Sequence, residues 1–255
     1  MSSHIDKIYK NTINCIKNQY KKIFFFTFFS EIVNFFLKNI SLITNKRSKE
    51  IMENISISSI QKSSIQNLIQ ELSQQDNFYV LKFIFFTFFI HIFSNSIQVC
   101  SILLLSKYFY TEKNISLSKI VRSSFLFFPK IFFLNLIVFF LVQLGFLCMF
   151  FPGILLIVFL SFSPIFAVQD IHSKITSSLK KSIFLVNSKI KTVSYTFLVY
   201  YSIKYAFFFL LIVSKPFFPI FFSYIFILLN KLLFSFLLIY FFTMYIAFDK
   251  KSENT

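Results

Sequence analysis

Six apolar runs alternate with polar or basic segments along this chain. A helix needs about 17–25 apolar residues to cross the hydrocarbon core of a bilayer, and each run has that length. The runs cover about 23–43, 83–105, 131–150, 152–168, 192–214 and 224–247. This pattern predicts an all-α, polytopic bundle of six transmembrane helices that forms one integral membrane domain, residues 1–255.

Two of the polar segments are basic and have apolar residues at helical spacing. These positions are Ile5, Ile8, Tyr9, Ile13, Ile16 and Tyr20 in 1–22, and Ile171, Ile175, Leu179, Ile183, Val186 and Ile190 in 169–191. Lysines fall between them, as is typical of amphipathic helices on anionic membrane. We predict a basic arm and a basic cytoplasmic helix, both on lipid of the inner leaflet. The alternatives are a solvated tail for the arm and a soluble protein partner for the helix.

The basic residues are distributed unevenly over the connections. Most of the 26 lysines and arginines fall in the arm, in the connection 106–130, in 169–191 and in the tail after residue 247. In the polar stretch 44–82 the basic residues are diluted by acidic ones. Because cytoplasmic segments of membrane proteins carry the excess of Lys and Arg, we predict that both termini are cytoplasmic. The stretch 44–82 is then an extracytoplasmic loop.

The third and fourth runs form one stretch without charge, between Lys130 and Asp170. As a single helix it would be about 58 Å long, roughly twice the hydrocarbon core, so the chain must turn. Pro152 removes a backbone donor and Gly153 accepts conformations that other residues resist, so we predict the turn at these two residues. Gly145, the other of the 2 glycines, is expected at a close contact between helices.

Several short motifs are similar to those of one known family. They are "FPKIF" at 128–132, "LVQLG" at 141–145, "FPGILL" at 151–156 and "SPIFAVQD" at 163–170, with "IYKNTINCIKNQ" near the start and "LLIYFFTMYIAF" near the end. Over nearly its full length, the chain thus resembles the YciC-like family of uncharacterised bacterial inner-membrane proteins. The resemblance implies a multi-pass protein of the bacterial cell inner membrane, and it carries over no catalytic or binding residue.

Polar residues within the runs form stripes along helix faces. The stripes are Thr27, Glu31, Asn34, Lys38 and Ser41 in the first run, Thr87, His91, Asn95, Gln98 and Ser101 in the second, Thr192, Thr196, Tyr200 and Lys204 in the fifth, and Asn230, Lys231 and Ser235 in the sixth. Stripes that face one another would line a polar path, with Glu31, His91 and Lys204 as its ionisable members. The alternative is that their hydroxyl and amide groups bond the helices together.

Composition narrows the functional classes. Hydrophobic residues make up 56% of the chain and the mean hydropathy is +0.71, far above the values of a soluble domain. The net charge of +16 indicates basic cytoplasmic segments rather than a nucleic-acid partner, because no soluble segment is long enough for a recognised module. The 3 cysteines and 3 histidines are scattered without metal-ligand spacing, so no metal or other cofactor is expected.

No motif for catalysis is found in the sequence. A nucleophile elbow, a phosphate loop and a zinc-protease motif are all absent, so we expect no enzymatic activity. The leading hypothesis is an integral inner-membrane protein of unassigned activity, with a structural or envelope-maintenance role. The alternative is a small transporter or channel that uses the polar stripes of the first, second and fifth spans. No inverted repeat relates the two halves of the chain, which disfavours transport.

Overall fold

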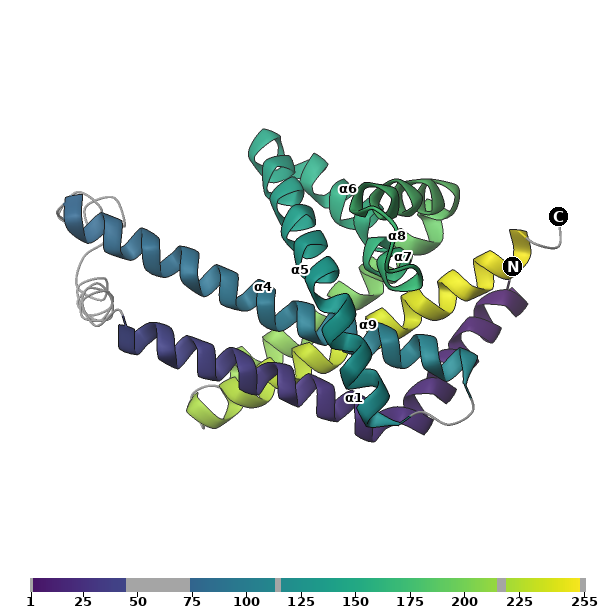
Figure 1. Cartoon of the computed structure of the whole chain (residues 1–255), viewed down its shortest axis with the longest axis horizontal. Coiled ribbons are helices and arrows are strands. Elements are labelled where there is room, and N and C mark those ends of the chain that lie inside the picture. Colours follow the sequence, from purple (N-terminus) through teal and green to yellow (C-terminus); the bar gives the residue numbers. More distant parts are fainter. Residues whose placement is uncertain (1, 45–73, 113–115, 215–218, 253–255) are drawn as a thin grey trace. The chain divides into compact units, whose positions relative to one another are not determined.

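The computed structural model describes residues 2–44, 74–112, 116–214 and 219–252, which form helices with no strand among them. The helices are α1 (Ser2–Thr44), α4 (Gln74–Thr111), α5 (Leu117–Cys148), α6 (Phe150–Leu160), α7 (Ser163–Gln169), α8 (Ile175–Ser214) and α9 (Pro219–Ser252) (Figure 1). Most of the predicted extracytoplasmic loop, residues 45–73, lies outside the described residues.

Six stretches of these helices are long and apolar enough to cross a membrane. They are Asp6–Ile40, Leu81–Thr111, Leu117–Cys148, Phe150–Gln169, Ile175–Leu210 and Tyr224–Phe248. The predicted all-α fold with six spans is therefore confirmed. The prediction that both termini are cytoplasmic concerns the side of the membrane, and it stays a prediction.

The helices on either side of the basic connection 106–130 extend well beyond the predicted spans. The 38 residues of α4 would measure about 57 Å along the axis, against about 30 Å for a hydrocarbon core. The connection therefore consists mainly of helix ends, with α4 reaching Thr111 and α5 beginning at Leu117. Ser116 caps α5, because its side chain accepts a hydrogen bond of 3.3 Å from the backbone N–H of Lys119.

The chain divides into two compact units that we describe separately. Unit 1 contains residues 1–29 and 96–255, and unit 2 contains residues 30–95. In unit 2, α1 and α4 are joined by the hydroxyl of Ser94, which donates a hydrogen bond of 2.6 Å to the carbonyl oxygen of Ser30. Large apolar side chains of this unit, Phe36 and Phe85 among them, are exposed, as lipid-facing residues of a membrane helix are.

The core of unit 1 is built around the second half of α4. Its residues from Gln98 to Ser106 are buried without interruption, so neighbours surround the helix on every side. The core also includes buried residues of α1, α7 and α9, with Phe162, between α6 and α7, completely buried. Unit 1 therefore contains a core to which several helices contribute.

The basic arm is the first part of α1, and one of its faces packs on protein. Contact of the predicted apolar stripe with lipid stays a prediction. Ile8 and Cys15 are buried in the core of unit 1, whereas Tyr9, Ile13 and Tyr20 are 62%, 44% and 58% exposed. The apolar positions of the arm are thus divided between a face packed on protein and an outer face that also carries lysines.

The charge-free stretch does turn into a hairpin, but at Met149 rather than at Pro152 and Gly153. Met149 is extended, with φ −166° and ψ 153°, and α6 begins at the next residue. Pro152 and Gly153 lie in the first turn of α6. Because the first N–H groups of a helix have no partner within it, proline is tolerated there and does not mark the turn itself.

The two glycines meet where α5 packs against α6. A Cβ on Gly145 would lie 2.9 Å from the Cα of Gly153, and a Cβ on Gly153 would lie 2.6 Å from the ring of Phe146. Neither glycine has a positive φ, so lack of space rather than backbone conformation requires them. The predicted close helix contact at Gly145 is confirmed, and its partner is the other glycine.

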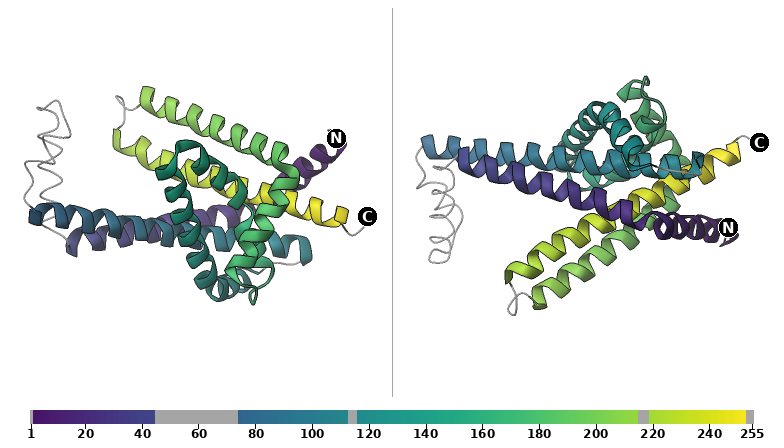
Figure 2. Two further views of the ribbon diagram at one scale, coloured as in Figure 1. Left: turned by 90° about the horizontal axis from the view of Figure 1, so that it is seen from above. Right: turned by 60° about the horizontal axis from the view of Figure 1, so that its bottom comes forward.

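Helices α8 and α9 run side by side in both views of Figure 2, in agreement with their contacts. The ring centroids of Phe197 and Phe241 are 5.3 Å apart, and those of Phe208 and Phe226 are 6.1 Å apart. Lys189 interrupts α8 with non-helical backbone angles, φ −132° and ψ 25°. The predicted basic helix therefore corresponds mostly to the part of α8 before this kink.

Candidate functional site

The three ionisable residues of the predicted polar path lie on three different helices. Glu31 on α1 is half-buried, and its Oε1 accepts a hydrogen bond of 3.3 Å from Nδ2 of Asn34. His91 on α4 is exposed, and Lys204 on α8 is half-buried. Glu31 and His91 belong to unit 2 and Lys204 to unit 1, so a path that would join them stays a prediction.

A buried polar cluster in unit 1 takes one residue from each of three predicted stripes. Thr27 of α1, Gln98 of α4 and Ser235 of α9 are all 0% exposed. Nε2 of Gln98 donates to Oγ of Ser235 at 2.9 Å and to the carbonyl oxygen of Lys231 at 2.7 Å. The hydroxyls of Thr27 and Ser235 are 3.0 Å apart. All three clustered side chains are neutral, so their chemistry is to hold three helices together by hydrogen bonds.

Further polar pairs join α4 to its neighbours. Nδ2 of Asn135 on α5 donates a hydrogen bond of 2.9 Å to Oγ of Ser96, and the hydroxyls of Ser101 and Ser124 are 3.3 Å apart. Among the residues that the structure describes, no group of His, Cys, Asp and Glu side chains could hold a metal ion. The polar residues that unit 1 does bring together are thus hydrogen-bonding partners between helices.

The fourth span is broken between α6 and α7, and hydroxyl groups occupy the broken ends. Ser161 and Ser163 donate to carbonyl oxygens of the last turn of α6 at 2.7 Å and 2.6 Å. Ser182 of α8 donates to the carbonyl oxygen of Phe159 at 2.6 Å and accepts from the N–H of Phe162 at 3.2 Å. Broken helices of transporters direct such backbone groups at substrate or ions, whereas here the protein itself binds them.

The C-terminal end of α7 is bound by a lysine from α4. Nζ of Lys107 donates to the carbonyl oxygen of Val168 at 2.9 Å and to that of Gln169 at 3.1 Å. The last carbonyl groups of a helix have no N–H partner within it and carry partial negative charge. A cation at this place therefore satisfies and stabilises the helix end.

A second lysine, Lys130 of α5, binds the turn that follows α7. Its Nζ donates to the carbonyl oxygens of Asp170 and Ile171 and, at 2.8 Å, to Oγ of Ser173. We refer to Lys107 and Lys130 as the lysine clamp. Sequence reasoning counted both only as cytoplasmic charges. For Lys130 the sequence did contain a signal of a structural role. Lys130 and Asp170 lie in two of the recognised motifs, one at each end of the charge-free stretch.

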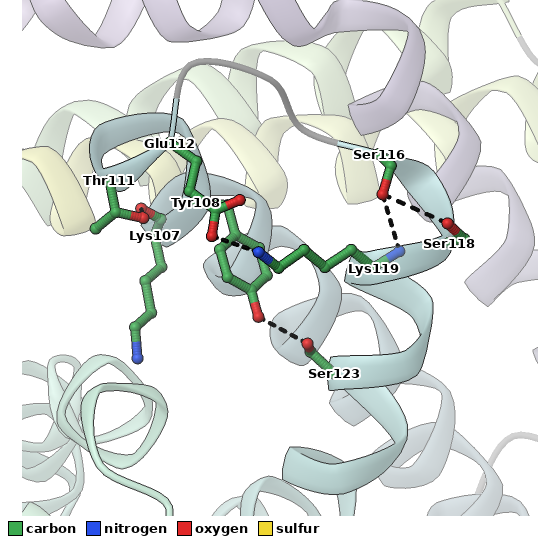
Figure 3. A network of polar contacts seen from close by, with 8 residues as sticks. All are labelled: Lys107, Tyr108, Thr111, Glu112, Ser116, Ser118, Lys119 and Ser123. Atoms are coloured by element: carbon green, nitrogen blue, oxygen red, sulfur yellow. Dashed lines mark hydrogen bonds and ion pairs between the residues drawn. The ribbon is translucent and has the colours of Figure 1, made fainter.

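The connection between α4 and α5 has a surface network of its own (Figure 3). Lys119 forms an ion pair with Glu112, and its Nζ lies 5.1 Å from the centroid of the Tyr108 ring. The hydroxyls of Tyr108 and Ser123 are 2.7 Å apart. These contacts join the last turn of α4 to the first turns of α5. Since the ion pair is at the surface, it orients these helix ends more than it stabilises them.

Contacts within unit 1 also bring the four basic segments together. The hydroxyl of Tyr110, at the end of α4, donates to the carbonyl oxygen of Asn11 at 3.5 Å and lies 3.0 Å from Oγ1 of Thr243. Nζ of Lys189 lies 5.8 Å from the ring centroid of Phe248. With the lysine clamp, these contacts join the basic arm, the basic connection, the basic helix and the end of α9. The segments with excess positive charge therefore lie at one end of this unit.

Comparison with known proteins gives a match over almost the whole chain. Residues 1–247 match the model of an uncharacterised protein family, UPF0259. A UPF0259 membrane protein of Buchnera aphidicola is 28% identical over 247 residues, which are 96% of this chain and 97% of the relative. One from Pectobacterium carotovorum is 26% identical over 210 residues, 82% of each chain. No solved structure matches.

Proposed function

This chain belongs to the UPF0259 family of membrane proteins, and from that premise we propose that it is a non-enzymatic, multi-pass protein of the bacterial inner membrane with a structural role in maintaining the cell envelope. The observation that carries this proposal is the use of polar groups in the spans of unit 1. The buried cluster of Thr27, Gln98 and Ser235 joins three helices, and serines occupy the broken ends of the fourth span. Polar groups used in this way contribute to helix packing.

A small transporter or channel is the second candidate, and a buried amide oxygen of the polar cluster favours it. Oε1 of Gln98 is buried and has no hydrogen-bond partner within the described residues. A buried amide oxygen without a partner is costly, and a water or a translocated solute would satisfy it. Together with Glu31, His91 and Lys204 it would belong to a polar path through the spans.

Substitution of the polar residues distinguishes the two candidates. In a strain that lacks the gene, we expect Glu31→Gln, Lys204→Met and Gln98→Leu each to restore the growth and lipid profile as the unaltered protein does. The Gln98 variant loses two hydrogen bonds of about 0.6 kcal/mol each and no longer buries an unpaired oxygen, so the fold tolerates it. Membrane fractionation checks that each variant is inserted. A variant that is inserted normally but does not restore the phenotype would support the polar path and contradict the structural role.

The basic segments support the proposed location and orientation. They lie at one end of unit 1, and positive charge gathers on the cytoplasmic side of inner-membrane proteins. Contact with the anionic lipid of the inner leaflet, rather than with nucleic acid, accounts for their charge. We expect a reporter fused after Thr255 to be active only in its cytoplasmic form. Activity of the extracytoplasmic form would contradict the orientation.

A further inference from the structure

A shallow, open groove with a mainly apolar lining lies between α7 and the first part of α8, and two lysine side chains border it. It has a volume of about 350 Å³. Its lining residues are Phe166, Lys180, Lys181, Phe184 and Leu185. The two lysines are adjacent in sequence, and both are exposed.

The groove lies on the outer face of this part of α8. The opposite face is packed on protein, because Ser178, Ser182 and Val186 are buried and Ser182 hydrogen-bonds to the chain between α6 and α7. Phe184 is left 81% exposed beside two ammonium groups. An aromatic side chain with lysines around it is typical of a helix at the membrane–water interface.

The position of this segment along α8 fits that interface. The 40 residues of α8 would measure about 60 Å, roughly twice a hydrocarbon core, so part of the helix lies outside it. The kink at Lys189 separates the part that carries the groove from the more apolar part that continues the span. The lysine clamp holds the turn that leads into the groove segment.

The charge around the groove indicates the ligand. Within the described residues, no acidic side chain forms an ion pair with Lys180 or Lys181. The carboxylate of Asp170, in the turn before α8, accepts a hydrogen bond of 2.9 Å from the backbone N–H of His172. The two ammonium groups are therefore available to an anion, and the adjacent aromatic rings to a hydrocarbon chain. A phospholipid with net negative charge supplies both in one molecule.

We propose that this groove binds one anionic phospholipid of the cytoplasmic leaflet. The phosphate accepts hydrogen bonds from the ammonium groups of Lys180 and Lys181, and an acyl chain lies along Phe184 and Phe166. The inference rests on the proposed inner-membrane location and deepens it, because it assigns a specific lipid site to a helix otherwise expected only to lie on the leaflet.

The absence of tryptophan from this chain makes a direct test possible. Phe184→Trp introduces one tryptophan in the groove, and its fluorescence reports bromine atoms on neighbouring acyl chains. The protein is placed in phosphatidylcholine nanodiscs that contain a minor fraction of either brominated phosphatidylglycerol or brominated phosphatidylcholine. We expect stronger quenching by the anionic lipid, with a preference of about fivefold for each lysine that binds the phosphate.

Two double variants in the Phe184→Trp background separate a site from diffuse attraction. Lys180→Gln with Lys181→Gln is expected to abolish the preference. Lys174→Gln with Lys191→Gln removes the same charge from exposed positions outside the groove and is expected to retain it. The proposal would be overturned if both double variants lost the preference for anionic lipid equally, or if the Phe184→Trp protein showed no preference. Quenching by neither lipid would also overturn it, because that result would indicate a soluble partner. The quenching measurement depends neither on the reporter at the terminus nor on an envelope phenotype. The lipid site can therefore be disproved while the proposed function holds.

Discussion

Replacing Lys107 and Lys130 together by methionine is expected to release residues 168–173 and to destabilise the protein. The hydrogen bonds of each ammonium group together contribute about 1.5–3 kcal/mol, so the double variant is expected to lose about 3–6 kcal/mol of stability. Methionine keeps most of the apolar length of a lysine side chain, so the loss reports mainly the ammonium groups. The two lysines bind different carbonyl groups, and each single variant is expected to show part of the effect. The measurements are the thermal midpoint in detergent and hydrogen exchange of residues 168–173.

The matched control for the lysine clamp is Lys119→Met. It removes one positive charge from the same basic connection, so it changes the charge balance as much as either single clamp variant does. Its partner Glu112 is at the surface, and the pair contributes little to folding. We expect almost no change in thermal midpoint. If Lys119→Met were as destabilising as Lys107→Met, general charge balance and not the clamp would be responsible.

Replacing Gly145 by valine is expected to separate α5 from α6. The free energy of unfolding should fall by at least about 1–3 kcal/mol, which is the usual cost of overpacking. A Cβ at this position meets the backbone of Gly153 at 2.9 Å, and a helix backbone cannot give way as a side chain can. The thermal midpoint in detergent measures the effect. The control is Leu144→Val at the neighbouring position, where the side chain is 56% exposed.

The second glycine provides a rescue experiment. A Cβ at Gly153 would meet the ring of Phe146, which is a side chain. Gly153→Ala should therefore be destabilising alone and recover when Phe146→Leu removes the ring. The same Phe146→Leu change should not rescue Gly145→Val. Rescue of both, or of neither, would contradict the contact that the structure shows between the two helices.

These experiments test contacts between helices, and the sequence indicated only some of them. The charge-free stretch required a turn, and the hairpin was predicted. The position predicted for it, Pro152 and Gly153, was wrong, because proline can occupy the first turn of a helix as well as the loop before it. For the basic arm, the spacing identified a helix, but it did not show that Ile8 and Cys15 would be buried in the protein core. Periodicity shows which residues share a face but not which face a neighbouring helix will cover.

The candidate site shows the same division. The stripes correctly contained Thr27, Gln98 and Ser235, but nothing in their spacing showed that Thr27 would meet a hydroxyl 208 residues away. The lysine clamp could not be predicted from residue types, because its acceptors are mostly backbone carbonyl groups, which every residue has. Lys130 beside the charge-free stretch was counted only as a charge at the membrane surface.

The sequence by itself determined the class of the protein, its six spans and its uneven distribution of charge. These properties depend on the length, hydropathy and charge of continuous segments, and the bilayer acts on each segment separately. The tertiary structure alone decided which polar groups pair, where the hairpin turns and why both glycines are needed. Those outcomes depend on how each helix is rotated and how closely two backbones approach, which are properties of helix pairs and not of any one segment.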